Sequence, residues 1–492
     1  MSVLKKLAGE TAIYGIPTIA GRLISFFLVP MYTNLFGPSE YGVVTSMFAY
    51  ASFFNVLFTY GMETTFFRFA NAHPENDKVY STAYNSIIIS TLFFLFIAIL
   101  FKQPIADWME IGEHPEYFLW FAIISGMDAL VALPFVKLRQ MGKAKRYALV
   151  KSINMFTNIG LNFFFLLLCP YLIKEGWTWI EVIYKPEVGI GYIFISNLIA
   201  SIITWPLVYP ENLQFNFGFD TELWKRMIIY ALPLLFVGFA GMINETLDRI
   251  LLTKLLPEDR ADYESGIYGA CYKLSILMTI FIQAYRMAAE PFLFARSKGE
   301  GAETMYAKLM NYFVIVCALI FLLVSFNLQL FADLFLRNKE YHAGLHIVPI
   351  LLLANMFLGI YFNLSIWYKL ADKTLIGSYI AVAAAGLTIL LNITLIPTIG
   401  YEGSAWATLI AYLFMMVLCY TTGKKYFPIP YQLTKIYALL LCMAVFYIFH
   451  EILKYQYQQV NIVVGIVLML AYAALALGIE RYGLLTKIGL KE

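Results

Sequence analysis

The chain has 492 residues, of which 61% are hydrophobic and only 14% are charged, and its mean hydropathy is +0.71. Soluble domains carry about 25% charged residues, because they need those residues to cover their surface. A net charge of +3 without a basic stripe excludes a nucleic-acid partner, and the apolar composition excludes disorder. The composition therefore predicts an all-α polytopic membrane protein.

A helix needs roughly 20 apolar residues to span a hydrocarbon layer of about 30 Å. Fourteen stretches meet this requirement and predict 14 transmembrane helices, joined by connectors too short for a soluble domain. In chain order the stretches are residues 11–36, 40–68, 80–101, 116–138, 147–170, 187–209, 223–255, 264–296, 305–332, 342–369, 374–396, 402–423, 433–453 and 460–480.

The distribution of Lys and Arg predicts how these spans are oriented. If both termini are cytoplasmic, 23 of the 35 basic residues lie on the cytoplasmic side, eight lie on the opposite side and four lie within spans. Tryptophans such as Trp120, Trp177 and Trp224 lie near the predicted span ends, where an interfacial aromatic belt is expected. We therefore expect both termini to face the cytoplasm.

Landmark residues recur in the same order in the two halves of the chain, which indicates an internal duplication. The landmarks pair residues 13–17 with 229–233, Tyr41 with Tyr268, Glu63 with Glu290, Tyr80 with Tyr306, Asn162 with Asn392 and Gly191 with Gly403. We predict two six-helix bundles, residues 1–215 and 216–425, related by a pseudo-twofold axis along the membrane normal, with two additional helices in 426–492. Parallel repeats of this kind are typical of transporters that work by alternating access.

Charged side chains within spans are candidates for function, because each costs at least about 2.5–3.5 kcal/mol near the bilayer centre. Arg22 lies near the middle of the first span, and we expect it to face a cavity and bind an anion. Phosphate is the favoured anion, since a planar guanidinium can hold it with two parallel hydrogen bonds. Lys273 and Arg286 are the other basic candidates for a translocation cavity.

Some of the intramembrane charges have partners on the same helix. Arg249 lies four residues after Glu245, and Glu290 lies four residues after Arg286, so each pair shares one helix face. A structural ion pair and a substrate contact are both consistent with this spacing.

Three acids, Glu63, Asp128 and Asp248, have no such local partner. One or more of them could bind a coupling proton or sodium ion, and we expect no other cofactor and no metal site.

Two further patterns have a structural and a functional interpretation. Pro17 and Pro233 occupy matching places in the two copies, where they produce either static bends or hinges. Asn154, Asn158 and Asn162 form one stripe along the fifth span, which either joins helices or lines the cavity.

Signatures of enzymes are missing from the sequence. It contains no H-E-x-x-H, G-x-S-x-G, Walker A or D-x-D motif, and its connectors are too short to build a catalytic lobe. We therefore expect a transporter and not an enzyme, with an integral-membrane polysaccharide polymerase or glycosyltransferase as the alternative.

The segment LFGPSEYG at residues 35–42 resembles the signature of bacterial polysaccharide-biosynthesis membrane proteins. These are the O-antigen and exopolysaccharide repeat-unit flippases of the multidrug/oligosaccharidyl-lipid/polysaccharide (MATE-like) exporter superfamily. In the related lipid II flippases, an arginine of the first span falls on Arg22. A second arginine of theirs falls on Leu28 here, and this difference argues against lipid II as the substrate.

The resemblance implies a flippase of the bacterial inner membrane that moves an undecaprenyl-pyrophosphate-linked oligosaccharide to the outer leaflet. Family members with 14 spans use the last two to form a groove for the lipid tail. The implied partners are the lipid-linked oligosaccharide, the bilayer and polysaccharide polymerase or assembly proteins, with no nucleic acid. A cation-coupled multidrug exporter of the same superfamily, which the unpaired acids would suit, is the alternative.

Overall fold

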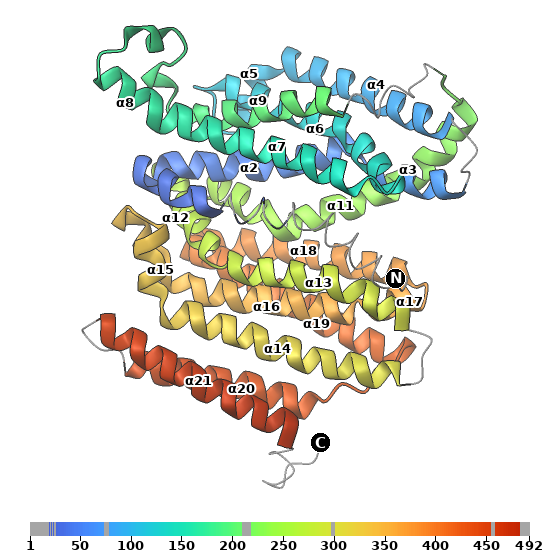
Figure 1. Cartoon of the computed structure of the whole chain (residues 1–492), viewed down its shortest axis with the longest axis vertical. Helices are drawn as coiled ribbons and strands as arrows, with labels where there is room; N and C mark the ends of the chain where they lie inside the picture. The colour runs from blue at the N-terminus through green and yellow to red at the C-terminus, as the bar shows by residue number, and fades with distance from the viewer. Residues whose placement is uncertain are drawn as a thin grey trace. The chain divides into compact units, whose positions relative to one another are not determined.

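The computed structural model describes residues 19, 21, 23, 26–72, 78–208, 218–296, 301–453 and 458–482 (Figure 1). Within these ranges every regular element is a helix, and no strand occurs. An all-helical fold is expected for a chain that spans lipid, because a helix satisfies its backbone hydrogen bonds internally. The predicted fold class is confirmed.

The described helices follow the predicted spans closely. Eleven described stretches are long and apolar enough to cross a membrane. The pair α12 and α13 meets the same criterion together with a bend of 49°, as a broken span or a re-entrant loop. The two other predicted spans coincide with shorter apolar helices, Phe26–Leu35 and Gly191–Leu207. These helices are consistent with 14 spans, and the exact number remains a prediction.

The first compact unit is formed by the described residues of 1–28 and 39–254. Its helices are α2 (Pro38–Thr59), α3 (Met62–Ala72), α4 (Lys78–Leu100), α5 (Lys102–Trp108), α6 (Pro115–Gln140), α7 (Ala144–Phe163), α8 (Cys169–Lys174), α9 (Gly191–Leu207) and α11 (Thr221–Leu255). A π-helical turn, Phe164–Leu168, joins α7 to α8. The core of this unit brings together α3, α4, α6 and the start of α11, where Leu223 and Met227 are buried.

The second unit is formed by the described residues of 29–38 and 255–492. Its α-helices are α12 (Glu258–Leu274), α13 (Ile276–Arg296), α14 (Ala302–Phe326), α15 (Leu328–Phe335), α16 (Val348–Leu364), α17 (Ile366–Leu370), α18 (Thr374–Ile399), α19 (Tyr401–Tyr426), α20 (Leu433–Ile452) and α21 (Gln458–Tyr482). The 3-10 helix η4 (Lys339–Ile347) precedes α16. The segment 29–38 is bound here through Thr33, whose hydroxyl donates to the carbonyl of Phe335 at 3.0 Å.

The last two helices, α20 and α21, pack against α14 and against each other (Figure 1). A buried amide fixes them: Asn311 of α14 donates to Gln432 Oε1 at 2.8 Å and to Glu480 Oε2 at 3.0 Å. The two helices that lie outside the sequence duplication are therefore an integral part of the second unit.

The helix α11 belongs to the first unit by its packing, although the duplication assigns it to the second copy. Trp224 donates to the hydroxyl of Ser86 at 2.8 Å, and the guanidinium of Arg68 lies 4.3 Å from the centre of the Tyr230 ring. A sequence repeat and a compact unit need not have the same limits, because the first reflects similarity of sequence and the second reflects packing. The repeat boundaries at residues 215 and 425 therefore stay a prediction.

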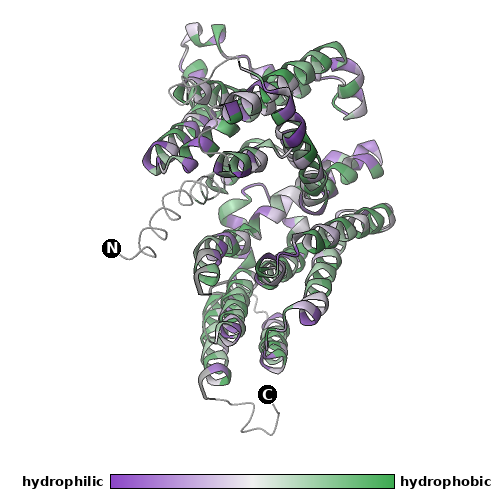
Figure 2. Cartoon of the chain, turned by 90° about the vertical axis from the view of Figure 1, so that its right-hand side faces the viewer, coloured by the Kyte–Doolittle hydropathy of each residue, from purple (hydrophilic) through white to green (hydrophobic). Residues whose placement is uncertain are grey.

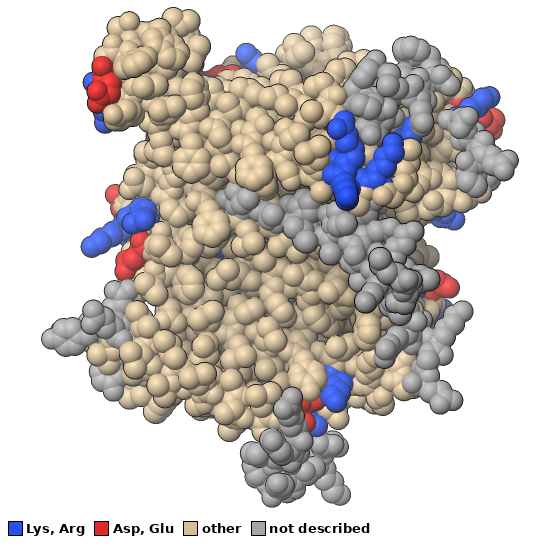
Figure 3. All heavy atoms as spheres, in the orientation of Figure 1, with Lys and Arg blue, Asp and Glu red and all other residues tan. Residues whose placement is uncertain are grey.

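Hydrophobic residues predominate in the helices, which Figure 2 shows nearly end-on. On the face drawn in Figure 3, Lys, Arg, Asp and Glu are sparse between those ends. Along α4, the side chains of Ile89, Phe93, Phe96 and Leu100 are all exposed. Such a surface is stable only in contact with lipid.

The second predicted span is broken between α2 and α3, at Tyr60 and Gly61, both of which have positive φ. Gly61 lies so close to α11 that a Cβ atom there would be 2.8 Å from Leu234 Cβ and 3.2 Å from the carbonyl oxygen of Ala231. Only glycine tolerates both the backbone conformation and this close approach.

We expect Gly61→Ala to destabilise the protein more than Gly142→Ala. Both positions have positive φ, but a Cβ atom at Gly142 would meet nothing within 4 Å. Left-handed strain of about 1 kcal/mol is common to both variants, and overpacking against α11 adds a further 1–3 kcal/mol at Gly61. Thermal unfolding in detergent measures the difference, and equal shifts would contradict the close packing of Gly61 on α11.

Candidate functional site

Two of the predicted site residues, Arg22 and Pro17, lie outside the described residues. Pro233 lies within α11, which runs without interruption from Thr221 to Leu255. The break at Gly61 contacts α11 at Ala231 and Leu234, on either side of this proline. A hinge at Pro17 and Pro233 remains a prediction.

Four charged side chains gather in the first unit, and we call them the first-unit cluster: Glu63 of α3, Asp128 and Arg139 of α6, and Lys151 of α7. Arg139 Nη2 lies 3.9 Å from Glu63 Oε2, and the charges of Asp128, Glu63 and Arg139 all act on Lys151. Asp128 also accepts a 2.9 Å hydrogen bond from Ser201. The two acids thus have partners, which the sequence did not reveal because those partners lie on other helices.

The geometry of this cluster leaves it able to bind a further group. The ion pair of Glu63 and Arg139 is long and both side chains are nearly half exposed, so the pair contributes little free energy of its own. The exposed Lys151 also lies over the ring of Phe135, 4.4 Å from its centre.

The asparagine stripe of α7 makes mostly structural contacts. Asn154 donates to the Ala200 carbonyl at 3.1 Å and to the Thr204 hydroxyl at 2.8 Å, and so joins α7 to α9. Asn162 is fully buried and donates to the backbone and side-chain oxygens of Asn158, at 2.8 and 2.9 Å. Whether Asn158 and Asn162 also line a cavity stays a prediction.

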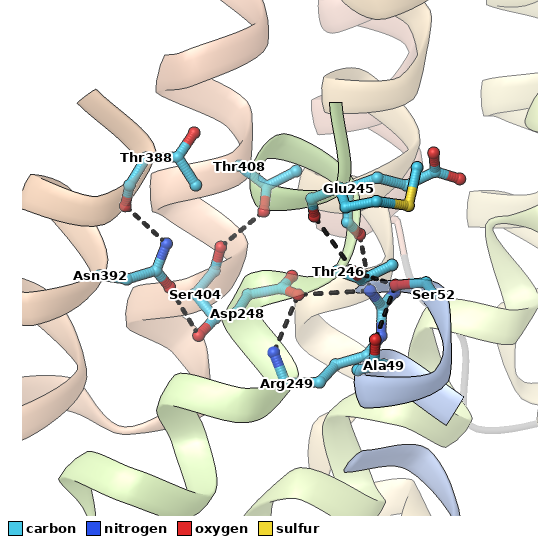
Figure 4. Close-up of polar contacts among 11 residues, drawn as sticks. Ala49, Ser52, Glu245, Thr246, Asp248, Arg249, Thr388, Asn392, Ser404 and Thr408 are labelled. Atoms are coloured by element: carbon cyan, nitrogen blue, oxygen red, sulfur yellow. Dashed lines mark hydrogen bonds and ion pairs between the residues drawn. The ribbon is translucent and has the colours of Figure 1, made fainter. Parts of the chain in front are cut away.

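On α11 the pairing of charges differs from the expected one (Figure 4). Arg249 Nη1 lies 3.2 Å from Asp248 Oδ1, and it donates to the backbone carbonyl of Glu245 at 2.6 Å. Arg249 thus pairs with the buried Asp248, and Glu245, whose side chain is exposed, contributes its backbone carbonyl. Whether Glu245 and Arg249 form a structural pair or contact substrate stays a prediction. Asp248 is half of a buried ion pair, whose breakage is costly.

Figure 4 also shows a polar group within the second unit, on α18 and α19. Asn392 donates to the Thr388 carbonyl at 2.8 Å, and its side-chain oxygen accepts a 3.1 Å bond from Ser404. Asn392 and its repeat counterpart Asn162 are both fully buried. The sequence duplication had paired Asn392 with Asn162, although neither residue is charged.

A second cluster lies in the second unit, and we call it the second-unit cluster: Arg286 and Glu290 of α13 with Lys369 of α17. Arg286 Nη2 lies 3.8 Å from Glu290 Oε1, as the spacing predicted, but Lys369 Nζ lies closer, at 2.6 Å. Sequence reasoning missed Lys369, because it is distant in the chain. Two cations against one carboxylate make this cluster cationic.

The surroundings of Arg286 leave hydrogen-bonding capacity unused. Its guanidinium lies 3.8 Å from the centre of the Phe362 ring, and Tyr285 donates to Asn363 Oδ1 at 2.9 Å. Among the described residues, Arg286 Nε and Asn363 Nδ2 are buried donors with no hydrogen-bond acceptor. Donors of this kind suit a phosphate or a sugar hydroxyl.

Lys273 does not join this cluster. It lies near the end of α12, 13 residues before Arg286 and beyond the bend between α12 and α13. This separation corresponds to about 20 Å along the helices.

The comparisons with known proteins agree with this helical architecture. Residues 7–297 match the family model described as polysaccharide biosynthesis protein, and the chain belongs to this family. A putative O-antigen transporter of Shigella flexneri is 20% identical over 290 residues, or 56% of this chain. The match spans only 64% of that transporter.

Two solved structures share the fold. The lipid II flippase MurJ in an inward closed conformation is 16% identical, with a TM-score of 0.69 over 94% of this chain and 98% of that one. An inward-facing MATE family multidrug resistance transporter of the MOP superfamily is 14% identical, with a TM-score of 0.60 over 84% of this chain and 94% of that one. The resemblance seen at residues 35–42 thus extends to the whole architecture.

We expect Asn154→Ala to destabilise the protein by about 1 kcal/mol, since hydrogen bonds between membrane helices contribute roughly 0.6 kcal/mol each and two are lost. Asn158→Ala is the matched control on the same stripe, because within the described part of the chain the Asn158 side chain is bonded only by Asn162, one turn away on the same helix. Unfolding in detergent with increasing denaturant compares the two. A larger effect at Asn158 would contradict the joining role of Asn154.

Proposed function

We propose that this protein is a flippase, which moves an undecaprenyl-pyrophosphate-linked oligosaccharide repeat unit from the inner to the outer leaflet by alternating access. The observation that carries the proposal is the family match over residues 7–297. The similarity to a lipid II flippase across 94% of the chain supports a lipid-linked substrate. The membrane is then the bacterial inner membrane, with both termini in the cytoplasm, and a polysaccharide polymerase would use the product.

The last two helices support a substrate with a lipid tail. On α21 the apolar side chains of Val463, Val467 and Leu470 are exposed. Asn311 holds both helices in place, so this apolar surface is a stable part of the second unit and suits a polyprenyl chain.

The two charged clusters support recognition of a pyrophosphate. Arg286 and Lys369 share a single carboxylate, Glu290, and phosphate oxygens can replace that carboxylate at little cost. No covalent chemistry is needed, because transport requires only that the site binds the head group in both orientations of the protein.

A cation-coupled multidrug exporter is the second candidate, favoured by the MATE-like fold and by the intramembrane acids Glu63, Asp128 and Asp248. Each of these acids has a cationic side chain nearby, at Arg139, Lys151 and Arg249 respectively. This pairing reduces the number of carboxylates that are ready to bind a coupling proton or sodium ion.

Deleting the gene distinguishes the two candidates. For a flippase we expect lipid-linked repeat units to accumulate at the cytoplasmic face and surface polysaccharide to be lost, as measured by extraction of lipid-linked glycans and by surface staining. Normal surface glycan together with new sensitivity to cationic dyes would instead establish the exporter.

We expect Arg22→Ala to abolish transport at unchanged protein levels and Arg22→Lys to restore only part of it. A guanidinium binds phosphate with two parallel hydrogen bonds, which an ammonium cannot reproduce. Arg226→Ala, which removes an exposed arginine at the start of α11, is the control. Complementation of the deletion strain gives the readout, and full activity of Arg22→Ala would remove this residue from the site.

A further inference from the structure

The connector between α8 and α9 is a folded segment. It contains two 3-10 helices, Thr178–Val182 and Pro186–Val188. Ile180 is fully buried, and the ring of Tyr184 stacks on Tyr192 with centroids 4.8 Å apart. The backbone N–H of Lys185 donates to the Tyr192 hydroxyl at 2.6 Å, and burial raises the pKa of the Tyr184 hydroxyl.

Four large apolar side chains of this segment point away from its anchor. Trp177 is 52% exposed, Trp179 is 54% exposed, Val182 is 83% exposed and Ile183 is 49% exposed. The two indole rings contact each other edge to face, 6.3 Å apart. We call Trp177–Ile183 the tryptophan segment. Because Ile180 and Tyr184 anchor the segment, these four side chains stay exposed. An apolar surface of this kind is expected to be covered by lipid or by another molecule.

The position of the segment along the span indicates what covers it. The helix from Ala144 to Lys174 has 31 residues and is about 46 Å long, which exceeds the hydrocarbon thickness of about 30 Å. Exposed apolar side chains, Leu167, Leu168 and Tyr171, run along it toward the tryptophan segment. The apolar surface of the segment therefore continues the lipid-facing surface of a membrane span.

The neighbouring helix α9 is short for a span. It has 17 residues, or about 26 Å, and its second residue, Tyr192, stacks on Phe165 with centroids 4.7 Å apart. From the level of Phe165, the π-helical turn and α8 together continue for nine more residues to Lys174, about 13 Å further along the helix axis. The connector joins the two helices across this difference in length.

The size of the apolar face argues against a protein partner. Four side chains exposed to this extent offer roughly 400 Å², about half of the ~800 Å² that each partner buries in a stable protein interface. Tryptophan is enriched at the membrane interface, where its apolar ring and polar N–H are both satisfied. Exposed charges at Glu181 and Lys185 border the face and can remain in water.

We propose that the tryptophan segment inserts into the interfacial region of the bilayer, in the leaflet on the side of Lys174, with Trp177, Trp179, Val182 and Ile183 facing lipid. The positive-inside distribution assigns this side to the outer leaflet. The segment then places lipid head groups beside the short helix α9, whose length matches a locally thinner bilayer. This inference does not depend on which substrate the protein moves.

An environment-sensitive fluorophore tests the insertion directly. In a chain whose five cysteines are replaced by alanine, Val182→Cys and, as the matched control, Glu187→Cys are labelled with NBD. Each labelled protein is reconstituted into vesicles of phosphatidylethanolamine and phosphatidylglycerol, with and without nitroxide-labelled lipid. We expect NBD at position 182 to emit at shorter wavelength and to be quenched several-fold more by the lipid nitroxide than NBD at 187. External iodide should quench the two in the opposite order.

Two outcomes would overturn the proposal. Equal quenching by iodide at 182 and 187 would place the segment in water, and protection of position 182 from both iodide and nitroxide lipid would mean that a second copy of the chain covers it. A second measurement needs no label: Trp177→Phe with Trp179→Phe should reduce the fraction of native tryptophan fluorescence that the lipid nitroxide quenches. None of these readouts requires transport, so a failed proposal about substrate would leave them unchanged.

Discussion

The cost of placing charge in lipid shapes the rest of this structure. A lone ionised side chain on a spanning helix is expensive, so charges survive there in groups that partly neutralise each other. The first-unit cluster balances two acids with two bases from α3, α6 and α7, and the buried Asp248 holds Arg249 on α11. The second-unit cluster leaves one positive charge in excess around Glu290. The proposed pyrophosphate site uses this excess positive charge.

The same constraint applies to the backbone wherever a spanning helix is interrupted. The chain breaks at Tyr60 and Gly61, bends at Ser275 between α12 and α13, and forms a π-helical turn at Phe164–Leu168. At two of these places a side chain donates a hydrogen bond to a backbone carbonyl. The Thr65 hydroxyl donates to the carbonyl of Gly61, and the Ser275 hydroxyl donates to the carbonyl of Tyr272. Irregular backbone at membrane depth requires such partners, because lipid offers none. The interruptions are therefore stable features that aim α3 and α13, the helices of Glu63 and Arg286, at their clusters.

Lipid also accounts for parts of the chain that the clusters do not need. The exposed apolar faces of α4 and α21 are ordinary surfaces in a bilayer, and Asn311 fixes the added helices through Gln432 and Glu480. If the tryptophan segment lies in the interface, the protein contacts lipid at two depths beside α9. Contact with lipid at both depths would suit a flippase, because the apolar tail and the polar head group of its substrate must both move through that leaflet.

The sequence by itself determined the membrane class, the positions of the helices and the family, because hydropathy and a local motif depend on neighbouring residues. It also found Arg286 with Glu290, whose pairing follows from helical spacing. Only the tertiary structure showed that Asp248 pairs with Arg249 and that Lys369 completes the second-unit cluster. It likewise supplied Arg139, Lys151 and Ser201 as partners of Glu63 and Asp128. These contacts join helices that are distant in the chain, and helix packing, which brings such residues together, is not encoded in any local pattern of the sequence.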